Sequence, residues 1–223
     1  LGEMIDNALG HILTASVISA PAAIMLALIM VPAVAEDSAQ IAGGDAVDIS
    51  TDYHNVMDAI ARGTSDGLKL TVNVGAMLLV FVALVALFNS ALSLLPYSSD
   101  DPLTLQTILG WMFAPLVWLM GIPWQEAQLA GTLMGIKTAL NELLAFLALV
   151  DLPAESLSDK STIIMTYALC GFANFGSLGI MIAGLTGMCS ERAHEIVALA
   201  PKSLISGTLA TCMTGTIAGL LSL

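Results

Sequence analysis

The sequence has little charge and very few cations. Only 11% of its 223 residues are charged, and six Lys or Arg stand against 18 Asp or Glu, giving a formal net charge of −12. A soluble domain carries roughly 25% charged residues, so this composition is not that of a soluble protein. Nucleic-acid binding needs a basic face, and the excess of acids excludes that class of partner.

Cysteine and histidine are also scarce. The three cysteines, Cys170, Cys189 and Cys212, are an odd number and lie within or beside apolar segments. A disulfide or metal framework needs closer, paired spacing, so we interpret them as small packing residues. The three histidines are far apart and show no ligand spacing. We therefore expect neither a metal site nor a cofactor.

Apolar residues, in contrast, make up 57% of the chain and are gathered into long blocks. Residues 12–35 and 70–95 contain no charge, and both blocks exceed the ~20 residues that a helix needs to cross a bilayer. Further apolar blocks occupy residues 103–122, 126–150, 162–188 and 197–223. The pattern predicts an all-α polytopic membrane protein.

Two segments of this chain are more polar or more aromatic than the rest. Residues 36–69 hold seven acids, and in the second half of this segment Val56 and Ile60 have helical spacing. We therefore predict an acidic loop, followed by a helix that leads into the crossing at 70–95. Within 103–122, Trp111 and Trp118 are seven apart and share one helix face. This arrangement favours an interfacial or short membrane helix, and an ordinary kinked core helix is the alternative.

The cations indicate how the chain is oriented, because cytoplasmic loops are enriched in Lys and Arg. If the crossing at 12–35 ends in the cytoplasm, one cation, Lys160, lies outside. Four of the six then lie inside: Arg62, Lys69, Arg192 and Lys202. This arrangement requires that 126–150 is a re-entrant hairpin and not a crossing.

The segment 126–150 contains an Asn141–Glu142 pair in apolar surroundings. A carboxylate at bilayer depth costs at least ~2.5–3.5 kcal/mol, and such a group usually faces a cavity and has a function. The alternative is a structural ion pair with Lys137. On a helix, Lys137 and Glu142 are about 140° apart, which is a poor partnership. Lys137 is instead expected to extend toward a membrane interface.

A second polar group occurs in "CGFANFGSLGI", residues 170–180. Three glycines weaken the helix there, so we expect 162–188 to be a broken helix. A break would allow Phe172, Asn174 and Ser177 to point into one cavity. Unwound helices that line a polar site are typical of secondary transporters, and two such groups in one chain favour a solute-binding site over packing.

Two further motifs indicate helices and their packing. Residues 63–67, "GTSDG", match the G-x-S-x-G pattern of a hydrolase, but that chemistry needs a strand before the serine, and the flanks here are helical. We therefore expect no enzyme. The G-x-x-x-G spacings at 131–135 and 215–219 allow close contact between helices and predict packing.

Several long stretches resemble, in order, the C-terminal part of the concentrative nucleoside transporters, the family of cation–nucleoside symporters. They are "ILTASVISAPAA" (12–23), "ARGTSDGLKLTVNVGAML" (61–78), "GWMFAPLVWLMGIPW" (110–124), "LNELLAF" (140–146), "YALCGFANFGSLGI" (167–180) and "SGTLATCMTGTIAGL" (206–220). The resemblance implies membrane crossings at 12–35 and 70–95, a re-entrant hairpin at 126–150, and a transport domain completed by 162–188 and 197–223.

The resemblance also implies a substrate site. Glu142 matches the family's hairpin glutamate, which binds the ribose hydroxyls of a nucleoside. Phe172, Asn174 and Ser177 match further residues of the nucleoside site. Family members form trimers, so the resemblance implies a homotrimer in the lipid of a plasma membrane or a bacterial inner membrane. It would take up nucleoside by alternating access, driven by sodium or protons.

Three positions depart from the family pattern: Gly176 replaces a serine, Thr211 an asparagine and Phe146 a tyrosine. The family's Gln-Thr-Glu hairpin, which contacts the base, and its cation ligands are not recognisable in the chain. The chain opens with Leu1 and shows no signal-peptide pattern, so we expect it to be part of a longer protein, with the coupling-ion site upstream. It would supply mainly the ribose half of the site. The alternative is a membrane subunit or fragment that does not transport.

Overall fold

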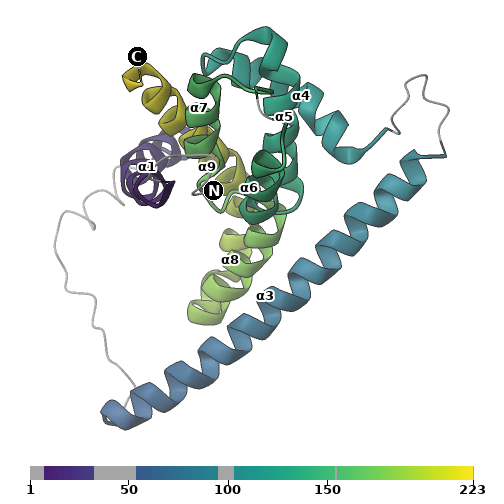
Figure 1. The fold of residues 1–223 in the computed structure, drawn as a ribbon. Helices are drawn as coiled ribbons and strands as arrows, with labels where there is room; N and C mark the ends of the chain where they lie inside the picture. Colours follow the sequence, from purple (N-terminus) through teal and green to yellow (C-terminus); the bar gives the residue numbers. More distant parts are fainter. Residues whose placement is uncertain (1–7, 33–53, 95–102, 154, 223) are drawn as a thin grey trace.

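The computed structural model describes residues 8–32, 54–94, 103–153 and 155–222 (Figure 1). Every regular element in these ranges is a helix, so the predicted all-α fold is confirmed. With the labels of Figure 1, the elements are α1 (Ala8–Met30), α3 (Val56–Leu92), α4 (Leu105–Leu119), α5 (Trp124–Ala139), α6 (Glu142–Val150), α7 (Asp159–Leu169), α8 (Phe175–Met188), the short 3-10 helix η1 (Ser190–Arg192) and α9 (Ala193–Leu221).

Helix α1 ends earlier than the predicted segment 12–35. It stops at Met30, and residues 33–35 lie outside the described residues. The cause is Pro32, because a proline disfavours helical backbone angles at the residue before it, here Val31. The first apolar block is therefore a helix that starts before residue 12 and ends two residues before Pro32.

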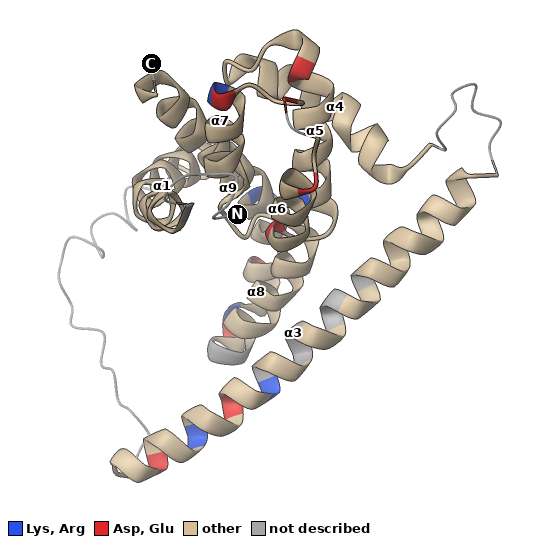
Figure 2. Cartoon of the chain, viewed as in Figure 1, with Lys and Arg blue, Asp and Glu red and all other residues tan. Residues whose placement is uncertain are grey.

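Helix α3 joins the charged and apolar parts of the chain without a break. It begins after Asn55, whose side chain accepts a hydrogen bond from the backbone nitrogen of Asp58 at 2.9 Å. Its first turns alternate acidic and basic residues (Figure 2), among them the exposed ion pair of Arg62 with Asp58. The helix lies along one side of the other helices (Figure 1), where it contacts α4 and α8. The predicted acidic loop at 36–53 lies outside the described residues.

The hydrophobic core lies among α4, α5, α6, α7 and α9. Glycines allow these helices to approach closely, as the G-x-x-x-G spacings predict. A Cβ atom built on Gly131 would collide with the backbone oxygen of Gly110, which lies on α4. A Cβ on Gly215 would lie 2.7 Å from the backbone oxygen of Ile164 on α7. The packing role of both spacings is confirmed.

Two pairs of helices are separated by short breaks. Helix α5 ends at Ala139, and Asn141 begins α6 by accepting a hydrogen bond from the backbone nitrogen of Leu144 at 2.9 Å. Helices α5 and α6 contact each other, as a helical hairpin requires; that the hairpin enters and leaves the membrane on one side stays a prediction. The second break covers residues 170–174, between α7 and α8.

The described helices include two that are long and apolar enough to cross a membrane, at Leu9–Met30 and Ser190–Leu221. The criterion concerns length and composition only. Helix α4 is shorter, and its buried face packs on α5 while Trp111 and Trp118 are about half exposed. Both tryptophans therefore lie on the surface of α4 that faces away from the core.

Candidate functional site

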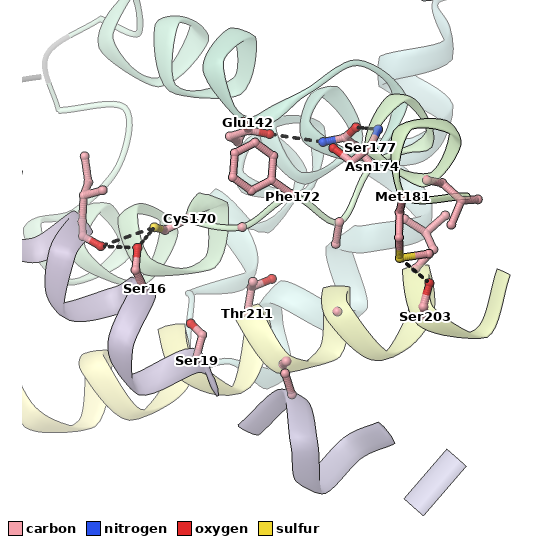
Figure 3. A pocket seen from close by; sticks show the side chains of 18 of the residues that line it. Ser16, Ser19, Glu142, Cys170, Phe172, Asn174, Ser177, Met181, Ser203 and Thr211 are labelled. Carbon is pink, nitrogen blue, oxygen red and sulfur yellow. Dashed lines mark hydrogen bonds between the residues drawn. The ribbon is translucent and has the colours of Figure 1, made fainter. Parts of the chain in front are cut away.

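A cavity of about 760 Å³ lies where the second break meets α1, α6, α8 and α9. All four residues predicted for the site line this cavity: Glu142, Phe172, Asn174 and Ser177 (Figure 3). In the sequence they belong to two separate segments, 126–150 and 162–188. The fold brings them together because α6 and α8 both start at the edge of the cavity.

Glu142 is the first residue of α6, directly after the cap Asn141. The start of a helix carries partial positive charge and unpaired N–H groups, which stabilise a carboxylate there. Oε2 of Glu142 accepts a hydrogen bond from Nδ2 of Asn174 at 3.2 Å. The side chain is half-buried and faces the cavity. A carboxylate is thus held at the cavity wall by a helix start and one amide.

Asn174 has two roles in this arrangement. Its Oδ1 accepts a hydrogen bond from the backbone nitrogen of Ser177 at 2.7 Å, which caps the start of α8. Its Nδ2 donates to Glu142. The side chain is only 2% exposed, so its amide plane is fixed by partners on both sides. One residue therefore starts α8 and links that helix to α6.

The position of the second break differs from the prediction in detail. The prediction attributed the break to three glycines, but Gly176 and Gly179 lie inside α8. The helix restarts at Phe175 because Asn174 caps it, and asparagine is among the best residues for that position. Phe172 stays in the break and is 76% exposed, with its ring on the cavity side (Figure 3).

The prediction for Lys137 is wrong. It does not extend toward a membrane interface: its side chain is 0% exposed, the most buried charge in the described part of the chain. Its Nζ donates to the backbone oxygen of Ala168 at 2.7 Å and to Oγ1 of Thr211 at 2.8 Å. Ala168 is in the last turn of α7, where carbonyl groups have no partner within the helix. The Lys137 ammonium therefore supplies a hydrogen-bond donor to a carbonyl group at the end of α7.

Helices α1 and α9 add cavity residues that sequence reasoning did not find. They are Ser16 and Ser19 on α1, and Ser203 and Thr211 on α9 (Figure 3). Only the packing of α1 against α9 turns these residues toward the break. A hydroxyl in a helix can bond its own backbone, as Ser16 and Ser19 do, so the residue type alone did not reveal a site.

The interpretation of the three cysteines as small packing residues is correct only in part. All three are free. Cys212 is buried in the core, while Cys189 is exposed and has no packing role of that kind. Cys170 lies in the second break and lines the cavity, with Sγ 3.6 Å from the backbone oxygen of Ile12 on α1. It thereby joins the break to α1.

Comparison with known proteins agrees with this geometry. The profile of the family described as "Na+ dependent nucleoside transporter C-terminus" matches residues 11–219. This chain belongs to that family. The nucleoside permease NupC of Helicobacter pylori is 40% identical over 218 residues, which are 95% of this chain and 51% of that protein. Human solute carrier family 28 member 3 is 38% identical over 227 residues, 95% of this chain and 33% of that protein.

Solved structures of CNTnw show the same fold. An inward-facing, substrate-bound state of that protein matches 77% of this chain and 43% of CNTnw, with a TM-score of 0.66 at 40% sequence identity. A variant in an intermediate state gives a TM-score of 0.70 at 41% identity, covering 75% of this chain and 42% of CNTnw. This nucleoside transporter homologue spans about half the length of NupC.

Membership of the family decides two broader predictions. The protein is an integral membrane protein of a transporter family and not an enzyme. The structure also explains the hydrolase-like match at residues 63–67. The G-x-S-x-G match lies within the continuous helix α3, so the strand and sharp turn that would expose a nucleophilic serine are not formed there.

Proposed function

We propose that the protein takes part in cation-coupled uptake of nucleosides by alternating access, and that this chain supplies mainly the ribose-binding half of the site. The observation that carries the proposal is the convergence of Glu142, Phe172, Asn174 and Ser177 on one cavity. Its volume of about 760 Å³ falls within the roughly 300–1,000 Å³ of typical small-molecule sites. Family membership supports the choice of substrate.

The hydrogen-bonding groups of the cavity suit a sugar. Ribose hydroxyls both donate and accept, and a carboxylate accepts only. Among the described residues, Oε1 of Glu142 has no partner, while Oε2 is held by Asn174. Asn174 still has one N–H to donate beyond its bond to Glu142. The pair can therefore accept from one ribose hydroxyl and donate to its neighbour, with charge-assisted strength on the Glu142 side.

Ser177 and Phe172 complete the proposed contacts. The backbone nitrogen of Ser177 is used by the α8 cap, which leaves its hydroxyl, as donor or acceptor, for a ligand. Phe172 offers a flat, exposed apolar surface against which a base or the carbon face of the sugar can pack. Polar contacts on one side and an aromatic face on the other fit a nucleoside better than a simple ion.

The coupling ion and the assembly are also proposals. Sodium or a proton would drive uptake, with ligands outside this chain, as the family resemblance implies. The same resemblance implies a homotrimer. Helix α3 supports an assembly of some kind, because it exposes many large apolar side chains along its length, among them Leu79, Leu87 and Phe88. A bilayer and partner subunits would together cover that surface.

The test is uptake of labelled uridine into proteoliposomes that contain the natural full-length protein. An inward sodium or proton gradient should cause uridine to accumulate above its equilibrium level. If neither gradient changes uridine uptake by folded protein, cation-coupled nucleoside transport is wrong for this protein.

The alternative is a membrane subunit or fragment that binds nucleoside weakly or not at all. The chain spans about half the length of NupC. Coupling requires that the cation prefers one conformation over another. We expect the 223-residue chain alone to insert into membranes but to show no sodium-driven uridine accumulation. This result is expected in both cases, so the two are distinguished by uridine accumulation in the natural full-length protein, which the alternative does not predict.

A further inference from the structure

We infer that Lys137 is a positioning residue, which holds the second break against α5 and α9 and so keeps Asn174 opposite Glu142. The observation is a buried ammonium bonded to the end of α7 and to Thr211. The effect on ligand binding rests on the function proposed above. The structural part of the inference, the fixed position of the break, does not depend on it.

The burial of Lys137 needs a physical cause. A buried ammonium is strongly unfavourable unless its donors are satisfied. No carboxylate lies within ion-pair distance of it among the described residues, whose ion pairs all lie elsewhere. The stabilising groups are instead dipoles: the carbonyl of Ala168 at the negative end of α7, and the hydroxyl of Thr211. The ammonium therefore holds the end of α7 in place, and we call this arrangement of Lys137, Ala168 and Thr211 the clamp.

This clamp acts directly on the second break. Ala168 is the last residue but one of α7, and the break begins two residues later at Cys170. Thr211 touches the break as well, because a Cβ atom built on Gly171 would lie 2.6 Å from Cγ2 of Thr211. The ammonium thus fixes both the carbonyl that precedes the break and the side chain that supports it from α9.

The same side chain is tied to the first break. Lys137 is in the last turn of α5, five residues before Glu142. Lys137 therefore connects the residues that precede the first break to those that precede the second break. The hydrogen bond from Asn174 to Glu142 connects the ends of the two breaks. If the ammonium is removed, the end of α7 loses its partner, and the distance between Asn174 and Glu142 is no longer held.

Substitutions of Thr211 distinguish a positioning role of Lys137 from a purely electrostatic role. Were Lys137 only a positive charge that favours ionised Glu142, removing the Thr211 hydroxyl would leave the ribose contacts unchanged. If Lys137 acts by position, Thr211→Val must disturb the break, because the ammonium then loses one of its two acceptors. Thr211→Ser keeps the hydroxyl that accepts from Lys137 but loses the methyl group beside Gly171, so its effect should lie between that of the natural protein and that of Thr211→Val.

The experiment compares Lys137→Met, Thr211→Val and Thr211→Ser in the natural full-length protein. Thr208→Val is the matched control, since Thr208 is buried one turn earlier on α9 and, within the described part of the chain, its hydroxyl bonds only to the backbone oxygen of Leu204 on the same helix. Two readouts are taken: hydrogen exchange of the backbone amides at 170–176, and the ratio of the affinities for uridine and 2′,3′-dideoxyuridine, which lacks the 2′- and 3′-hydroxyls. The less drastic valine variant decides the question if the methionine variant does not fold.

We expect Lys137→Met and Thr211→Val to speed amide exchange at 170–176 and to reduce the preference for uridine by roughly tenfold. Thr208→Val should change neither readout, and Thr211→Ser, which keeps the acceptor of Lys137, should change both by less than Thr211→Val does. Unchanged exchange in both disruptive variants overturns the inference, and so does an equal loss for both ligands, which would be a general loss of stability. If the natural protein binds no nucleoside, the proposed function fails, and the exchange data alone decide whether the clamp exists.

Discussion

Asn174 donates a hydrogen bond from Nδ2 to Oε2 of Glu142 over 3.2 Å, and this bond joins the starts of two helices. Glu142 opens α6, and Asn174 caps α8. Both polar side chains are therefore positioned by the ends of the two breaks, where the backbone changes from an extended to a helical conformation. The two breaks and the ribose contacts proposed for them are consequently one structural feature, and the variants below are chosen to separate its parts.

The first prediction concerns the carboxylate. Glu142→Gln in the natural full-length protein should abolish nucleoside uptake, because the amide cannot supply the charged acceptor. Folding and insertion should persist, since Gln fits the same space and Asn141 still caps α6. Labelled uridine uptake and membrane abundance are measured together. Normal uptake by the Gln variant would remove Glu142 from the site.

A second prediction separates the two roles of Asn174. Serine also caps helices well, so Asn174→Ser should preserve α8 but lose the amide that holds Glu142. We expect uridine affinity to fall roughly threefold to tenfold. Asn141→Ser is the control, because Asn141 caps α6 and is not among the residues that line the cavity. Equal effects of the two substitutions on a binding titration would show that only capping matters.

Ser177→Ala removes a hydroxyl but leaves the backbone nitrogen that Asn174 caps. If the hydroxyl contacts sugar, affinities for uridine and adenosine should weaken by similar factors. The loss of one neutral hydrogen bond is worth ~0.5–1.5 kcal/mol, or about twofold to twelvefold in affinity. Competition binding with both nucleosides checks this. A variant that discriminates sharply between the two bases would contradict the sugar assignment.

Stability is predicted to depend on the close contact of α7 and α9. Gly215→Ala would place a methyl group 2.7 Å from the backbone oxygen of Ile164, which cannot move aside as a side chain does. Overpacking of this kind costs ~1–3 kcal/mol, so the melting temperature should fall. Gly184→Ala on α8 is the control, since nothing lies within 4 Å of its Cβ position. A melting temperature that is lower for Gly184→Ala than for Gly215→Ala would refute the packing role.

The polar residues predicted for the cavity, Glu142, Asn174 and Ser177, could be found because a polar group in an apolar membrane segment is costly unless a function or a partner compensates for it. Glu142 and Asn174 stood out from their neighbours by type alone. The restart of α8 at Phe175 was also predictable, since Asn174 is a strong helix cap. The glycines obscured that signal, because Gly176 and Gly179 are tolerated inside α8.

Lys137 could not be predicted, because its partners are defined only by the tertiary structure. Ala168 becomes an open acceptor only where α7 ends, and Thr211 reaches the same point only through the packing of α9 on α7. Snorkelling is the usual behaviour of a membrane lysine. The general rule failed here because the end of α7 and a hydroxyl of α9 meet deep in the protein and supply acceptors that water would otherwise provide.

The most direct test of the ribose site is a binding titration of the natural full-length protein and of Glu142→Gln, each with uridine and with 2′,3′-dideoxyuridine. Hydrogen bonds to a charged group contribute ~1.5–3 kcal/mol, which corresponds to roughly 10- to 150-fold in affinity. The natural protein should prefer uridine by at least the lower factor, and the preference should fall by at least that factor in Glu142→Gln, with the contacts of Asn174 and Ser177 accounting for what remains. Equal binding of both ligands to the natural protein, or an undiminished preference in the variant, would contradict the account.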